Sequence, residues 1–142
     1  MKKKILISIP AYNEANNIRP LYKKLNETLE EKRDEVDFEI LFINDGSKDN
    51  TVSEVLSLIE QTDNVSLIDL SRNYGNEIAM SAGFDYSTHD AVITMDADLQ
   101  HPPATIIDMI DLWQQGYEDV YAKRNQRKGE SWFKKTSSKW FY

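Results

Sequence analysis

The chain has 142 residues, of which 40% are hydrophobic and 29% charged, so it is large enough for about one domain with a buried core. It has no cysteine and no apolar run of about 18 residues, which excludes disulfides, thiolate chemistry and a membrane-spanning helix within it. The net charge of −7 is unevenly distributed: residues 123–142 hold seven Lys or Arg against one Glu, about +6, whereas residues 1–122 carry about −13. The negative charge of residues 1–122 disfavours nucleic acid as their partner.

Apolar runs of strand length alternate along the chain with longer amphipathic stretches. Strands are predicted at residues 4–12, 38–45, 65–71 and 91–96. Helices are predicted at about residues 14–32, 50–61, 75–86 and 103–115. The strands are almost continuously hydrophobic, as in a mostly parallel sheet that is covered by helices on both faces. The pattern therefore predicts an open α/β fold.

Three of the predicted strands end in clusters of polar residues. The clusters are PAYNE at residues 10–14, NDGSKDN at residues 44–50 and DADLQ at residues 96–100. In open α/β sheets, ligands bind in the crevice outside the carboxyl ends of the strands. We therefore expect the three clusters to converge on one binding site.

The DADLQ cluster places two carboxylates, Asp96 and Asp98, on the same side of an extended chain. No Lys or Arg lies within twenty residues on either side, so the expected partner of this pair is a metal ion. Oxygen ligands suit Mg²⁺ or Mn²⁺, and Gln100 would add a neutral oxygen. The structural alternative is that Asp98 caps the following turn and Asp96 only ends a strand.

The other polar clusters each have a structural and a functional interpretation. Ser47 or Asp49 explains most of NDGSKDN as a helix cap, whereas Asp45 at the strand tip is placed to bind a nucleobase or ribose. Tyr12 would stack on a base or pack at the rim of the core. Gly75 opens a helix whose N-terminus faces either an anion or a plain capping turn.

The basic end of the chain combines lysines with aromatic residues. On a helical wheel, Trp132, Phe133, Trp140 and Phe141 occupy one half and three lysines the other. This pattern predicts that residues 129–142 form a helix at a membrane surface. The alternative is an ordinary amphipathic helix that packs on its own domain.

Taken in order, PAYNE, NDGSKDNT, SRNYGNE, MDADLQHPP and KRNQRKGESWFKK resemble the family 2 glycosyltransferases with a Rossmann-like GT-A fold. The resemblance is to the polyprenyl-phosphate branch, which includes dolichyl-phosphate mannose synthases and bactoprenol glucosyltransferases. It implies that the nucleotide is held by Pro10, Tyr12, Glu14 and Asp45, with Asp96 beside the ribose. It further implies that Asp98 and Gln100 bind the metal and that Arg124 and Arg127 contact phosphates, with Asp98 and these two arginines serving catalysis.

This resemblance implies an inverting transfer of a sugar from a nucleotide diphosphate sugar, UDP- or GDP-linked, to a polyprenyl phosphate. It implies a nucleotide-sugar-binding domain at residues 1–122 and, at residues 123–142, the start of an acceptor or membrane-interface segment. Members of the family usually continue well beyond this length, so we expect an N-terminal catalytic fragment of a protein at the cytoplasmic face of the membrane. The rival hypotheses are a non-catalytic nucleotide-binding or membrane-docking domain and, less favoured, a D-x-D phosphatase.

Overall fold

In the computed structural model, the described residues are 1–123 and 132–136, the latter by their backbone alone. They fall into two compact units, residues 1–101 and residues from 102 onward. The first unit contains a sheet of four parallel strands in the order β3-β2-β1-β4. Its strands are β1 (Lys3–Ala11), β2 (Val36–Asn44), β3 (Val65–Asp69) and β4 (Ala91–Thr94).

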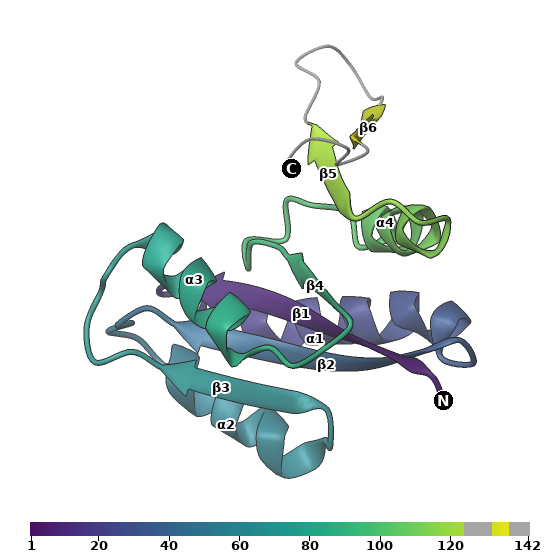
Figure 1. Ribbon diagram of the computed structural model, residues 1–142. Coiled ribbons are helices and arrows are strands. Elements are labelled where there is room, and N and C mark those ends of the chain that lie inside the picture. The colour runs from purple at the N-terminus through teal and green to yellow at the C-terminus, as the bar shows by residue number, and fades with distance from the viewer. Residues whose placement is uncertain (124–131, 137–142) are drawn as a thin grey trace. The chain divides into compact units, whose positions relative to one another are not determined.

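Helices cover both faces of this sheet, as the sequence predicts (Figure 1). The chain steps from β1 to β2 to β3 and then returns past β1 to β4. Right-handed crossovers therefore place the first two helices on one face and the third on the other. The helices are α1 (Ala15–Leu29), followed by the short 3₁₀ turn η1 (Glu30–Lys32), then α2 (Thr51–Gln61) and α3 (Asn76–Tyr86).

The core lies between the sheet and its helices because the strands are apolar on both faces. Ile5, Ile7 and Ile9 alternate with Leu6 along β1, and all four are almost fully buried. The buried residues of α1 recur at helical spacing: Ile18, Leu21, Leu25 and Leu29. The long strands and helices predicted from these patterns are confirmed, with bounds that differ by a few residues.

The second unit contains α4 (Ala104–Gln114) and a pair of antiparallel strands, β5 (Asp119–Lys123) and β6 (Trp132–Thr136). The helix predicted over residues 129–142 is therefore wrong at residues 132–136, which form a strand. Aromatic residues and Thr favour strands, and pairing with β5 satisfies the backbone polar groups that a helix would have satisfied internally. Residues 129–131 and 137–142 lie outside the described part, and no helix in the described part is long and apolar enough to cross a membrane.

Candidate nucleotide-sugar site

The candidate site lies where the direction of strand addition reverses, at the carboxyl ends of β1, β2 and β4. Such a switch point is the expected ligand crevice of an open parallel sheet. A cavity of about 350 Å³ is found there, entirely within the first unit. Among its lining residues are six of those predicted from the sequence: Pro10, Tyr12, Glu14, Asp45, Asp96 and Asp98.

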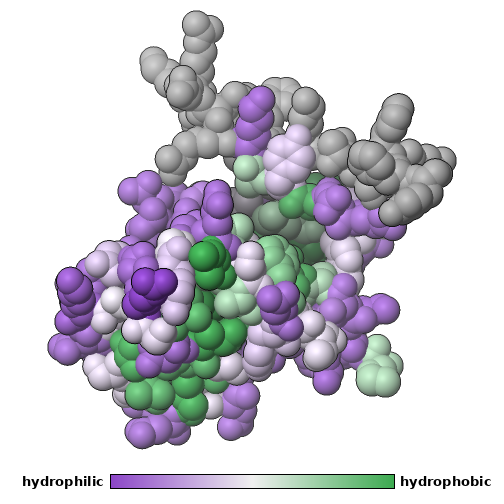
Figure 2. Space-filling view, turned by 60° about the vertical axis from the view of Figure 1, so that its left-hand side comes forward, coloured by the Kyte–Doolittle hydropathy of each residue, from purple (hydrophilic) through white to green (hydrophobic). Residues whose placement is uncertain are grey.

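The predicted convergence of the three polar clusters is thus observed, although the predicted residues are not all present. Gln100 is exposed and does not line this cavity. Arg124 and Arg127 lie outside the described residues. Figure 2 turns the carboxyl-end side toward the viewer and shows hydrophilic residues around an exposed hydrophobic patch.

Asp96 and Asp98 follow β4 with their side chains exposed, separated by the buried Ala97. Asp98 Oδ1 accepts a hydrogen bond from the backbone N–H of Gln100 at 3.0 Å, so the predicted turn-capping role is present. The second carboxylate oxygen has no such bond among the interactions of the described residues. Leu99, between Asp98 and Gln100 in the sequence, has a φ of 62°, a conformation that costs a non-glycine residue about 1–2 kcal/mol.

The loop after β1 is fastened to the loop after β2 by hydrogen bonds from both sides. The backbone N–H of Asn13 donates to Ser47 Oγ at 2.9 Å, and Asn13 Oδ1 accepts from the backbone N–H of Lys48 at 2.8 Å. Asn13 has a φ of 53°, a left-handed conformation that Asn tolerates better than most residues. These bonds fix Tyr12 and Glu14 relative to Asp45. Asn13 was not among the site residues predicted from the sequence, and its place between a strand and a helix was the available signal.

Asp49 joins the starts of α1 and α2 by accepting hydrogen bonds from the first residue of each helix, although the N-cap position of α2 is Asn50 and not the predicted Ser47 or Asp49. Its Oδ1 accepts from the N–H and the hydroxyl of Thr51 at 2.9 and 2.5 Å, and its Oδ2 accepts from the N–H of Ala15 at 3.2 Å. Burial opposes ionisation of Asp49, but these hydrogen bonds outweigh it and hold the pKa of the carboxyl below its usual value.

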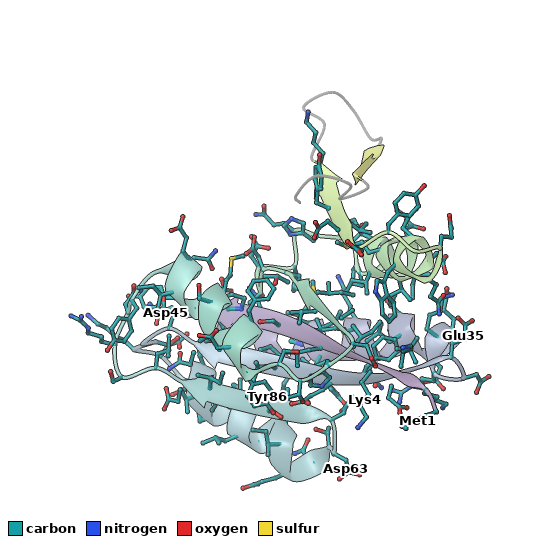
Figure 3. The ribbon with its side chains drawn as sticks, viewed as in Figure 1. Met1, Lys4, Glu35, Asp45, Asp63 and Tyr86 are labelled. Atoms are coloured by element: carbon teal, nitrogen blue, oxygen red, sulfur yellow. The ribbon has the colours of Figure 1, made fainter. Side chains whose placement is uncertain are left out.

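Asp45 is 4% exposed and lies beside the start of α3 (Figure 3). Its two oxygens accept hydrogen bonds from the backbone N–H groups of Tyr74 at 2.7 Å and Gly75 at 3.1 Å. Gly75, with a φ of 99°, is the residue that opens α3, as predicted. Asp45 therefore satisfies two backbone N–H groups of a loop that is distant in sequence. Its nucleoside-binding role stays a prediction, since each carboxylate oxygen accepts more than one hydrogen bond.

Comparison with protein families gives a match over residues 6–142 to the model described as glycosyl transferase family 2. A relative from Synechocystis sp. (strain ATCC 27184 / PCC 6803 / Kazusa), named "Uncharacterized glycosyltransferase sll0501", is 43% identical over all of this chain and 44% of that protein. The bactoprenol glucosyl transferase of Shigella phage SfX is 42% identical over 98% of this chain and 45% of that protein. The chain thus spans less than half the length of these relatives.

Solved structures share the fold at lower identity. The mannosyltransferase PcManGT from Pyrobaculum calidifontis, in complex with GDP-Man and Mn²⁺, has a TM-score of 0.68 and 22% identity over 86% of this chain and 35% of its own. S. aureus TarS 1–349 in complex with UDP-GlcNAc has a TM-score of 0.63 and 21% identity over 84% of this chain and 33% of its own. The extent of the family match, supported by the fold, shows that the chain belongs to glycosyl transferase family 2.

Proposed function

We propose that the protein transfers a sugar, with inversion, from a nucleotide diphosphate sugar to a polyprenyl phosphate at the cytoplasmic face of a membrane. The observation that carries this proposal is the cavity at the switch point, where six predicted donor-site residues from three strand ends come together. Relatives named as bactoprenol glucosyl transferases support the lipid acceptor. Solved structures with bound GDP-Man and UDP-GlcNAc support the class of donor.

The donor's nucleoside would lie between the first two loops of the site. Tyr12 is 43% exposed and lines the cavity, so its ring is available to stack on a base. Asp45 and Asp96 supply carboxylate oxygens for N–H groups of the base or hydroxyls of the ribose. Pro10 and Glu14 complete the wall formed by the loop after β1.

The diphosphate would lie beside the two carboxylates after β4. Two exposed aspartates on a cavity wall fit a hard cation such as Mg²⁺ or Mn²⁺, which binds one or two carboxylates together with substrate phosphates. The described residues contain no group of three or more acidic, His or Cys side chains for a metal, so the donor would supply further ligands. Asp98 would hold the ion, which when bound neutralises charge on the departing diphosphate. Gln100 does not line the cavity, so its side chain would have to turn toward Asp98 to join the ion. Arg124 and Arg127 are proposed to contact the phosphates.

The acceptor chemistry needs little from the protein beyond orientation. A polyprenyl phosphate is already ionised at neutral pH, so no side chain has to remove a proton. Its oxygen attacks the anomeric carbon from the face opposite the diphosphate. The new carbon–oxygen bond forms as the bond to the diphosphate breaks, and the electron pair leaves with the nucleotide. Attack from the opposite face inverts the anomeric configuration.

The lipid acceptor would be approached through the basic end of the chain. Residues 123–142 carry about +6, and basic residues are attracted to anionic headgroups by about 1 kcal/mol each near the surface. We propose that residues 129–142 contact the membrane surface, with residues 132–136 doing so as a strand. The strand replaces the predicted helix at residues 132–136, and the membrane surface stays the proposed partner.

The experiment is a transfer assay with radiolabelled UDP-glucose, UDP-GlcNAc and GDP-mannose, Mn²⁺ and a polyprenyl phosphate in detergent. The expected result is label in the lipid phase with one donor, and its loss in Asp98→Asn. Binding of a donor with no label in the lipid phase, even when the chain is extended to the full length of its relatives, would instead support a non-catalytic nucleotide-binding domain. Release of inorganic phosphate without sugar transfer would support a phosphatase.

A further inference from the structure

The loop formed by residues 71–75 is fixed against the end of β2 by a close approach of two backbones. Gly46, the residue after Asp45, has a φ of 71°. A Cβ atom at Gly46 would lie 2.3 Å from the backbone N of Asn73 and 2.4 Å from the backbone carbonyl carbon of Arg72. Only glycine leaves room for the loop at this distance.

Hydrogen bonds hold the same loop from its two sides. The backbone N–H of Leu70 donates to the carbonyl oxygen of Asn44 at 2.9 Å, just before the loop begins. Asp45, almost fully buried, accepts from the N–H groups of Tyr74 and Gly75 at its end. Gly46 and Asp45 together form what we call the clasp. The backbone of Asn73 lies between these fixed points.

Asn73 occupies a particular position within the fixed loop. Together with Tyr12 it lines both the site cavity and a neighbouring cavity of about 600 Å³. Asn73 is exposed, and no hydrogen bond of its side chain is found within the described part of the chain. Its amide carries two N–H donors and one oxygen acceptor. A fixed backbone thus presents an unused amide at the boundary of two cavities.

The two cavities are lined by different polar residues at the ends of the strands. Asp96 and Asp98 line the smaller cavity only, whereas Asn44 and Asp69, from the ends of β2 and β3, line the larger one. The diphosphate joins the sugar to the nucleoside, so when it lies beside Asp98 one of these two groups extends toward Tyr12 and Asn73. The nucleoside suits these side chains, because its base has a flat face for an aromatic ring and an edge of donors and acceptors for an amide.

We infer that Asn73 is a specificity-determining residue that hydrogen-bonds the nucleoside of the donor and is held in position by the clasp. This inference rests on the proposed function, because it takes the ligand to be a nucleotide diphosphate sugar. It assigns the SRNYG segment a role in binding as well as in starting α3. It also gives Asp45 an indirect role, through the loop, beside any direct contact with the ligand.

The first test compares Asn73→Ala with the parent by calorimetric titration of UMP, UDP, GMP and GDP in the presence of Mn²⁺. Loss of one neutral hydrogen bond should weaken binding by about three- to tenfold, by the same factor for the monophosphate and the diphosphate. Asn50→Ala is the matched control, since Asn50 is also exposed, lines neither cavity and makes no side-chain cap. Its affinity should equal that of the parent.

The second test moves the loop without touching the Asn73 side chain. Gly46→Ala should weaken nucleotide binding, whereas Gly116→Ala should not, because Gly116 has a φ of 100° but nothing within 4 Å of its Cβ position. Both variants introduce backbone strain, and only the first displaces the loop. In a Gly46→Ala background, Asn73→Ala should cause no further loss, since coupled residues are not additive. If Gly46→Ala does not fold, the Asn73→Ala titration still decides.

Two outcomes would overturn the inference and are distinguishable. If the parent binds a nucleotide and Asn73→Ala binds it equally well, or loses affinity for the diphosphates alone, Asn73 does not bind the nucleoside and the proposed function stands. If the parent binds none of the nucleotides, the inference and the proposed function fail together.

Discussion

The packing of α3 on the sheet gives a sharp prediction, because a helix glycine lies directly over a strand serine. A Cβ atom at Gly83 would lie 2.2 Å from Ser8 Oγ and 3.0 Å from Ile43 Cδ1. Ser8 is 1% exposed, and its hydroxyl has no hydrogen-bond partner in the described part of the chain. Gly83→Ala should therefore overpack this contact. Ser8→Ala removes a buried hydroxyl that forms no hydrogen bond with the described residues.

The magnitudes follow from the distances. Alanine in a helix interior is favoured over glycine by about 1 kcal/mol, whereas overpacking a filled core costs about 1–3 kcal/mol, and an overlap at 2.2 Å belongs at the upper end. Gly83→Ala should thus lower the free energy of unfolding by about 1–2 kcal/mol. Ser8→Ala should leave it unchanged or raise it slightly.

The double variant is the decisive one. Without Ser8 Oγ, the new methyl group meets Ser8 Cβ at 3.2 Å, a contact that a small shift relieves. The double variant should recover at least about 1 kcal/mol relative to the sum of the single effects. Urea denaturation followed by circular dichroism measures all four proteins. Strict additivity would refute the close packing of α3 on β1.

Three further predictions concern the site's scaffold and the basic end. Because the pKa of Asp49 is lowered in the folded state, its stabilising contribution is present above about pH 4 and is lost as the pH falls through the folded-state pKa. Urea denaturation at a series of pH values should therefore show that Asp49→Asn loses less free energy of unfolding on acidification than the parent does. Asp49→Ala should cost about 1 kcal/mol of stability at pH 7 and weaken nucleotide binding, since the loop after β1 loses its bond to Asp49. Unchanged nucleotide affinity would show that the hydrogen bonds of Asp49 do not position the site. Anionic vesicles should shift the tryptophan emission of the chain in a salt-sensitive way after Trp113 is replaced, and an unchanged spectrum at low salt would exclude membrane contact by residues 129–142.

The fold was predictable from the sequence because its main elements are encoded locally. Buried strands such as β1 and β2 are continuous apolar runs, and α1 repeats its apolar residues at helical spacing. Polar clusters at strand ends then predict a site, since parallel strands end at the same edge. Six of the eleven residues that line the cavity were predicted, four from these clusters and, through the family resemblance, Pro10 and Glu14 as well.

The parts that could not be predicted depend on contacts distant in sequence. No local pattern shows that the carboxylate of Asp45 binds a loop 30 residues away, or that Gly46 lies against the backbone of Arg72. The pairing of β5 with β6 likewise depends on a partner strand, so a helical wheel drawn on residues 129–142 alone predicted the wrong element at residues 132–136. Asn13 was missed because its role is to join two loops that are separate in sequence.

The central claim is that this cavity binds a nucleoside diphosphate with a metal held by Asp98. Calorimetric titration of UDP and GDP, with and without Mn²⁺, into the parent and Asp98→Asn tests it most directly. Asparagine keeps an oxygen that accepts the Gln100 N–H, so the turn should persist while the charge is lost. The account predicts that Mn²⁺ tightens binding of at least one nucleotide by the parent and has little effect with Asp98→Asn. An equal effect of Mn²⁺ on the two proteins, or no nucleotide binding by the parent, would contradict it.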